Sequence, residues 1–324
     1  MSFTVLSAHV VEEARLTMKK GSLSFFLACQ LLKEKARVAI YFLYAWCRFS
    51  DDVIDQDVSG LEDLDLEKRL TLLRQDTVGA FEQKPQPLAL KKIAGSTLAF
   101  KGMALLNQSY QLPSIYPSEL LEGMKMDAEG YTYHTYADLD LYCYRVAGVV
   151  GLMSCHVLGI TDHEALAHAD ALGRGMQLTN IARDIKEDGE NGRIYVPREW
   201  WDEFGLTKDD FLEHQRPELI AKVAKKLIDR ANPLYREGEK GLRYLNFRCA
   251  FAVASARYIY AEIGHEVVRR GAKAWDQRTW IPLPRKLVLV GKAFLLTLKT
   301  IPWRLKNGSG SIMINQYRHY QLGR

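Results

Sequence analysis

The distribution of prolines limits the possible folds of this chain more than any other feature of its sequence. The ten prolines leave two long proline-free spans, 1–84 and 118–196. Within these spans apolar residues recur at intervals of three and four, without convincing alternation at period two. Spacing of three and four places apolar residues on one face of an α-helix, whereas strands need alternation. The sequence therefore predicts an all-α protein.

The expected helices cover most of the chain and are separated by short loops. Ser59-Gly60 opens the first clear loop, the segment 83–87 is the second, and the segment 189–198 is the third. None of these loops is typical of a domain boundary. The predicted helices are 8–19, 22–31, 34–56, 65–82, 88–107, 116–130, 137–159, 162–188, 217–246 with a kink near Pro233, 249–270 and 284–300.

The composition indicates a soluble globular protein in a reducing compartment. The 324 residues are 48% hydrophobic and 26% charged. The five cysteines are odd in number and never form a Cys-x-x-Cys, which favours free thiols over a disulfide framework or a zinc site. Residues 1–20 lack the apolar core of a signal peptide. No apolar run reaches the roughly 18 residues that span a bilayer. We therefore expect a cytoplasmic protein.

The net charge of +5 is concentrated at the C-terminal end. Residues 277–324 contain nine Lys and Arg and no acidic residue, so the preceding residues carry a net charge of −4. A nucleic-acid-binding protein would need a basic face on its folded body, so this distribution argues against nucleic acid as a partner. A basic tail is better suited to an anionic membrane surface.

Residues 44–55 place carboxylates at the end of a helix that is expected to be buried. The preceding segment 40–43 is apolar in every direction, which is typical of a buried helix. Two carboxylates one turn apart can hold Mg²⁺, which prefers oxygen ligands, although a solvated helix end is the usual explanation of an isolated Asp-x-x-x-Asp. Asp52 adds a third carboxylate. Residues at intervals of four, three and four share one face: Tyr44, Arg48, Asp51 and Asp55.

A second acidic cluster, in 177–188, makes a metal site more probable than a solvated helix end. Asp184 and Asp188 repeat the one-turn spacing, and Gln177 and Asn180 lie on the same stripe. Two such helices suggest carboxylate pairs that face each other across a central cavity, as in metal-binding bundles. Without a Glu-x-x-His, Mg²⁺ with a polyphosphate is favoured over iron. The nearby cations are Arg183 and Arg193.

The signatures of several other enzyme classes are absent. The sequence has no P-loop, no Gly-x-Ser-x-Gly and no His-Glu-x-x-His. A dinucleotide-type pattern that starts at Gly173 fails because Leu178 replaces its third glycine. The small and apolar residues of 142–151 either pack helices closely or line an apolar tunnel, and core packing is the simpler interpretation.

At the two acidic clusters the sequence resembles the phytoene/squalene synthase family, the head-to-head class of trans-prenyltransferases. Segment 43–55, LYAWCRFSDDVID, is similar to the first aspartate-rich motif in its bacterial form, and segment 177–197, QLTNIARDIKEDGENGRIYVP, to the second. Segment 21–25, GSLSF, is similar to the family's Gly-Ser-Lys-Ser-Phe, with Leu23 in place of the usual Lys. Segment 142–151 also matches, with Arg145 where a small residue is common. The similarity extends from about residue 10 to 280.

The resemblance implies an isoprenoid synthase-type helical bundle over 1–280 with a central active-site cavity. It implies two allylic diphosphates bound with Mg²⁺, or with Mn²⁺ as an alternative. The first would ionise to an allylic cation that the double bond of the second attacks. The resulting cyclopropylcarbinyl diphosphate would ionise and rearrange to a linear product. We expect two geranylgeranyl diphosphates to give phytoene in carotenoid biosynthesis, which needs no NADPH.

Two alternatives stay open. Two farnesyl diphosphates would give squalene, whose reductive route needs NADPH, or dehydrosqualene. A non-catalytic prenyl-lipid-binding subunit is the other, although a scaffold would not need both acidic motifs.

The resemblance also implies roles for individual residues. The expected metal ligands are Asp51, Asp55, Asp184 and Asp188, with Asp52 in support. The residues expected to hold diphosphate are Arg48, Arg183, Arg193 and Arg278, and Tyr260 is expected near one diphosphate. The remaining residues expected to line the site are Ser22, Tyr44, Gln177, Asn180 and Tyr195. The aromatic candidates for shielding the cation are Phe25, Tyr41, Tyr44, Phe49 and Tyr142, each of which could equally be core.

The basic tail, 281–324, belongs to the same domain or contacts a membrane. Its segment 285–306 mixes Leu, Val, Phe and Trp with six cations, which is too charged to span a bilayer but suits an interfacial helix. A terminal helix docked on the bundle is the equally supported alternative.

Overall fold

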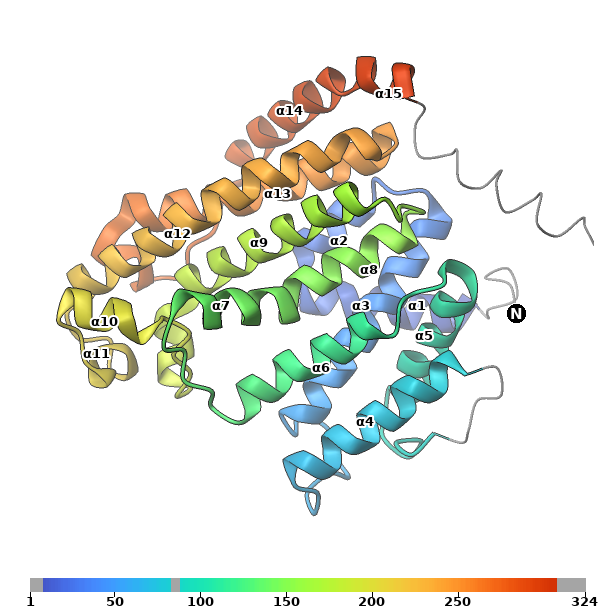
Figure 1. Cartoon of the computed structure of the whole chain (residues 1–324), viewed down its shortest axis with the longest axis horizontal. Coiled ribbons are helices and arrows are strands. Elements are labelled where there is room, and N and C mark those ends of the chain that lie inside the picture. The colour runs from blue at the N-terminus through green and yellow to red at the C-terminus, as the bar shows by residue number, and fades with distance from the viewer. Residues whose placement is uncertain (1–7, 83–87, 308–324) are drawn as a thin grey trace, which may run out of the picture.

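The structure is a computed structural model that describes residues 8–82 and 88–307, and these residues form helices and no strands (Figure 1). The all-α prediction is confirmed. The predicted loop at 83–87 and the end of the predicted tail, 308–324, lie outside the described residues. The helices are α1 (Ala8–Gly21), α2 (Leu23–Cys29), α3 (Glu34–Ile54), α4 (Leu66–Phe81), α5 (Ser96–Tyr110), α6 (Ile115–Ala128), α7 (Tyr136–Cys143), the π-helix η2 (Tyr144–Gly148), α8 (Val149–Val157), α9 (His163–Glu190), α10 (Arg198–Phe204), α11 (Lys208–Leu212), α12 (Pro217–Lys240), the 3₁₀ helix η3 (Gly241–Tyr244), α13 (Phe247–Arg270), the 3₁₀ helix η4 (Gly271–Trp275), α14 (Leu283–Lys299) and α15 (Ile301–Asn307).

The predicted helix boundaries are wrong in four places. Residues 88–95 form turns, and α5 starts only after Gly95, whose positive φ of 87° favours glycine. The predicted helix 137–159 is interrupted by the π-helical turn η2. α12 runs through Pro233 as predicted but ends at Lys240, before η3, and not at residue 246. The short helices α10 and α11 were not predicted, because helices of five to seven residues leave little periodic signal.

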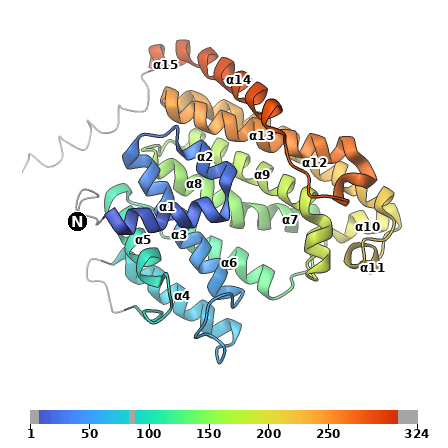
Figure 2. The same ribbon diagram turned by 180° about the vertical axis from the view of Figure 1, so that it is seen from behind.

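Helices α3 and α9 are the two elements around which the others pack. α3 contacts α1 and α5, while α9 contacts α8, α12 and α13 (Figures 1 and 2). Two glycines allow the close approach at α9. A Cβ at Gly151 would lie 2.6 Å from the Ala169 carbonyl oxygen, and one at Gly173 would lie 2.4 Å from that of Ala147. The small residues of 142–151 therefore do pack helices closely.

The hydrophobic core has two parts. One surrounds α3, with Phe42 and Trp46 fully buried, and the other lies between α9 and α12, with Tyr235 almost fully buried. Each such side chain contributes about 1.5–3 kcal/mol through its burial. The partly buried Val146 packs against both parts, so η2 stands where they meet.

The C-terminal helix α14 lies along α13 in both views of the chain (Figures 1 and 2). Leu289, Ala293 and Thr297 recur every four residues and are buried on its inner side. Its other side exposes large apolar side chains, among them Leu287 and Leu295. The helix is therefore docked on the bundle and still presents an apolar surface.

None of the helices in the described ranges combines the length and the apolar character needed to cross a membrane.

Candidate active site

The two acidic clusters of the sequence lie at neighbouring helix ends. Asp51 lies in the last turn of α3, and Asp55 is the residue that ends this helix. Asp184 and Asp188 lie in the last turns of α9. Arg193, just beyond α9, donates a hydrogen bond of 2.9 Å to Asp55 Oδ1 across 138 residues of sequence. This contact joins the two motifs directly.

The carboxylates of the site are in an environment that disfavours their negative charge. Burial, followed by the charge of Asp55, raises the pKa of Asp51 to about 6. Burial, followed by the charges of Asp184 and Asp127, raises the pKa of Asp188 to about 7. Crowded carboxylates repel one another, so a cation placed among them would lower their free energy. The arrangement thus has the electrostatic character of a cation site.

Asp127 of α6 is a member of this cluster that the sequence reasoning missed. Tyr142 donates a hydrogen bond of 2.7 Å to Asp127 Oδ2, and Tyr195 hydrogen-bonds the same carboxylate. Burial raises the pKa of Asp127 to about 6. In the sequence this residue stands near a helix end before Glu129 and has no acidic partner one turn away. Only its contacts with distant tyrosines distinguish it from a solvated residue.

Arginines supply the counter-charges on both sides of the site. Arg48 lies 3.1 Å from Asp51 and 2.5 Å from Asp52. On α9, the Arg183 Nε donates a hydrogen bond of 2.8 Å to Asp184, and Arg278 lies 3.5 Å from the same carboxylate. These guanidinium groups present donors that also match phosphate oxygens.

The part of the chain that the structure describes contains no group of three or more acidic, histidine or cysteine side chains arranged to hold a metal ion by itself. The carboxylate pairs do supply the oxygen ligands that Mg²⁺ prefers, and Mg²⁺ usually completes its shell with water and substrate phosphate oxygens. The donor chemistry therefore fits a divalent cation that is bound together with a diphosphate.

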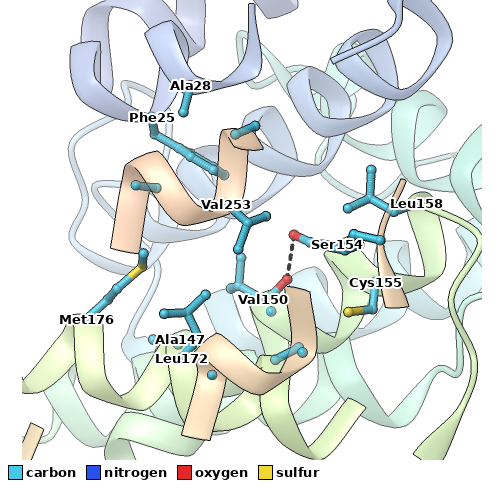
Figure 3. Close-up of a pocket in the computed structure, with 18 of the residues that line it drawn as sticks. Phe25, Ala28, Ala147, Val150, Ser154, Cys155, Leu158, Leu172, Met176 and Val253 are labelled. Atoms are coloured by element: carbon cyan, nitrogen blue, oxygen red, sulfur yellow. Dashed lines mark hydrogen bonds between the residues drawn. The ribbon is translucent and has the colours of Figure 1, made fainter. Parts of the chain in front are cut away.

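An apolar cavity of about 300 Å³ extends between the helices (Figure 3). It begins beside the charged groups, because Tyr260 in its lining interacts with Arg183 and Asp184. Gln177, Asn180 and Tyr260 line it at the end nearest Asp184. Ser154 also lines it, but its hydroxyl donates to the Val150 carbonyl oxygen at 2.7 Å, so this polar group is satisfied within α8. The rest of the lining is largely apolar, as a hydrocarbon ligand requires.

The cavity meets the charged groups near segment 21–25 and Tyr44. A Cβ at Gly21 would lie 2.0 Å from Tyr44 Oη, so a larger residue here would displace the Tyr44 ring. The side chain of Ser22 hydrogen-bonds Tyr260, whose pKa is raised by burial. Phe25 lines the cavity, and its ring centroid lies 6.5 Å from that of Tyr44. The side chain of Leu23 lies outside the described residues.

The other aromatic candidates lie away from the cavity lining. Tyr41 and Phe49 are buried in the core around α3. Tyr142 stacks on Tyr195 with ring centroids 5.0 Å apart, and both rings pack beside Asp127. Arg145, the departure from the family block, donates to Glu119 of α6 at 3.0 Å.

Comparison with known proteins agrees with this geometry. The family model for squalene/phytoene synthase matches residues 18–286. The chain is 39% identical to a 15-cis-phytoene synthase of Enterobacter agglomerans, over 84% of this chain and 91% of that protein. It is 36% identical to a 15-cis-phytoene synthase of Pantoea ananas, over 91% and 94% of the two chains.

Solved structures confirm the predicted isoprenoid synthase-type fold. A dehydrosqualene synthase superposes with a TM-score of 0.76 at 28% identity, covering 88% of this chain and 95% of that one. A squalene synthase from Alicyclobacillus acidocaldarius superposes with a TM-score of 0.71 at 25% identity, covering 81% and 94%.

Proposed function

Because this chain belongs to the squalene/phytoene synthase family of prenyltransferases, we propose that it is a phytoene synthase that condenses two geranylgeranyl diphosphates head to head. The observation that carries this proposal is the apolar cavity that starts at the paired acidic motifs. Such a cavity accepts a prenyl chain while the charged end receives its diphosphate. The agreement with curated phytoene synthases over most of the chain favours the longer substrate.

Asp51, Asp55, Asp184 and Asp188 are proposed to hold Mg²⁺, with Mn²⁺ as an alternative. Burial, followed by the repulsion among these carboxylates, raises the pKa values of Asp51 and Asp188, and this supports the assignment. When bound there, the metal supplies positive charge that makes diphosphate a better leaving group. Asp52 supports the site by holding Arg48.

The arginines are proposed to hold the diphosphates by exchanging carboxylate partners for phosphate oxygens. The residues with this role are Arg48, Arg183, Arg193 and Arg278. The side-chain network of Ser22 and Tyr260, together with Gln177 and Asn180, then positions the first carbons of the prenyl chain. Positioned donors that meet developing charge lower the barrier to ionisation.

Aromatic and apolar walls are proposed to keep the allylic cation from water. Phe25 lines the cavity, and Tyr44 packs beside it and near Arg48 and Asp51, so the faces of these two rings would stabilise the cation. Tyr142 and Tyr195 are proposed to act differently, by orienting Asp127 beside the metal-binding carboxylates.

The test is to incubate the pure protein with Mg²⁺ and either farnesyl or geranylgeranyl diphosphate, with and without NADPH, and to identify the hydrocarbon. We expect phytoene from geranylgeranyl diphosphate without NADPH. Squalene or dehydrosqualene as the main product would favour the C30 alternative. No product from either substrate would refute the enzymatic function and favour a prenyl-lipid-binding subunit.

We further propose that the protein is cytoplasmic and contacts a membrane peripherally through its C-terminal tail, with 1–280 as the enzyme domain. The exposed apolar side of α14 and its lysines support this, because an insoluble product must reach a lipid phase. Replacing Leu287 and Leu295 with Asp should reduce flotation with anionic liposomes. A 1–280 truncation should float less than the full chain, and equal flotation would exclude the tail as the anchor.

A further inference from the structure

The cavity has a defined long axis with one charged and one apolar end. Along α9 its lining runs from Asn180 to Ala165, fifteen residues apart. At 1.5 Å per residue this corresponds to about 22 Å. Along α13 the lining runs from Tyr260, at the charged end, to Ala252, and the wall continues before this helix through Leu245 and Leu242. The α9 wall therefore gives the cavity a depth of about 22 Å.

Tyr244 lies at the far end of this axis. It lines the cavity, and its hydroxyl donates a hydrogen bond to Glu164 in the first turn of α9. Arg243 pairs with the same carboxylate. The Glu164 contact places the tyrosine at the end of α9 that is opposite Asp184 and Asp188. The other residues that line this end are smaller: Leu158, Ile160, Ala165, Leu242 and Leu245.

Tyr244 is also supported from behind by the C-terminal helix α15. The ring of Trp303 meets the Tyr244 ring edge-on, with centroids 5.1 Å apart. Arg304 donates a hydrogen bond of 3.3 Å to the Leu242 carbonyl oxygen, which ties α15 to η3. The Tyr244 side chain is held by the hydrogen bond of its hydroxyl and by the neighbouring Trp303 ring, so it cannot easily turn away from a ligand.

We propose that Tyr244 is the end stop of the cavity and sets the longest prenyl chain that the enzyme accepts. This inference rests on the proposed function. With carbon–carbon bonds of about 1.5 Å, extended C15, C20 and C25 prenyl chains measure roughly 14, 19 and 24 Å. A depth of about 22 Å accommodates the C20 chain and excludes the C25 chain. The C15 chain would leave the far end empty and lose the contacts made there.

The first test compares Tyr244→Ala with Tyr244→Phe, which keeps the ring and removes only the hydroxyl. The kcat/KM of each full-length variant is measured separately with farnesyl, geranylgeranyl and geranylfarnesyl diphosphate. We expect Tyr244→Ala to raise the C25-to-C20 ratio of kcat/KM by about tenfold or more, because its cavity is longer. Tyr244→Phe should keep the wild-type ratio. Equal ratios in the two variants would overturn the inference.

The second test shortens the cavity instead. Ala169 lines it one turn inward from Ala165, so Ala169→Leu moves the floor by about 6 Å, more than one isoprene unit. We expect the C20-to-C15 ratio to fall by about tenfold. The control is Ala167→Leu, an identical change at an exposed position of the same helix, which should leave the ratio unchanged. An unchanged C20-to-C15 ratio of kcat/KM in Ala169→Leu would contradict the proposed position of the prenyl chain along α9.

The ratios of kcat/KM between substrates distinguish an end stop from a residue that only stabilises the fold. A loss of stability would lower kcat/KM for all three substrates together and leave the ratios unchanged. If Tyr244→Ala does not keep the wild-type helical circular dichroism, Tyr244→Leu replaces it with the same expected direction. Product from wild type with unchanged ratios in the variants would refute the end stop and leave the proposed function intact. No product from wild type with any of the three diphosphates would refute both.

Discussion

The charged end of the site and the apolar end of the cavity are lined by the same helices but are built in opposite ways. At the charged end, long polar side chains in the last turns of α3 and in the segment after α9 contact one another and partly face solvent. Toward the apolar end, small residues such as Ala165 and Ala169 line space that no side chain fills. We propose that the charged end carries out the chemistry and that the apolar end selects for chain length.

Loss of a carboxylate that is proposed to bind the metal should have the largest effect. It should impair the chemistry at the charged end and leave the fold and the apolar end unchanged. Asp51→Asn and Asp184→Asn should each lower kcat by about a thousandfold, because several kcal/mol of charge stabilisation are lost. The helical circular dichroism signal should stay that of wild type. The control is Asp63→Asn, an exposed carboxylate outside the site. Substantial turnover in either site variant would refute the metal assignment.

The bond between Arg193 and Asp55 offers a second way to test the charged end. Arg193→Gln removes a charge-assisted hydrogen bond that joins the two motifs, which should cost about 2 kcal/mol, or about thirtyfold in kcat/KM. Arg193→Lys should restore part of this loss. Arg198→Gln, at an exposed position over the Trp201 ring, is the control and should be near wild type. Equal activity in the Gln and Lys variants would argue against a role for the charge.

The packing of the cavity wall should affect stability more than chemistry. Gly173→Ala places a Cβ 2.4 Å from the Ala147 carbonyl oxygen, so it should destabilise the protein by about 1–3 kcal/mol. The free energy of unfolding from urea titration measures this. Gly291→Ala, on the exposed side of α14 with nothing near its Cβ, should be neutral or slightly stabilising. A neutral Gly173→Ala would mean that η2 and α9 can move apart without loss of stability.

The smallest expected effect concerns the coupling of Asp127 to the metal-binding carboxylates. The charge of Asp127 helps raise the pKa of Asp188 to about 7, so Asp127→Asn should lower that pKa. Asp188 would then stay ionised at lower pH, and the acid limb of the pH profile of kcat/KM should move to lower pH. Glu129→Gln, which removes an exposed charge two residues away, should leave the limb in place. An unmoved limb in Asp127→Asn would show that Asp127 does not act on Asp188.

Most of the fold was predictable because helices leave a local signal. Long amphipathic segments such as α9 and α13 were predicted to within a few residues. The π-helical turn η2 was not predicted, because it keeps the same apolar composition as the helices around it. The apolar residues of 88–95 have helical spacing and predict a helix, but these residues form turns, and α5 starts after Gly95.

The sequence by itself determined the helical class and the carboxylate pairs, since residues four apart on a helix share a face whatever surrounds them. Only the tertiary structure decided that Arg193 meets Asp55, that Asp127 joins the site and that Tyr244 closes the cavity. Each of these facts depends on side chains from helices far apart in sequence. The depth of the cavity in particular depends on the space that remains when those helices pack together. The local periodicity of the sequence does not specify that space.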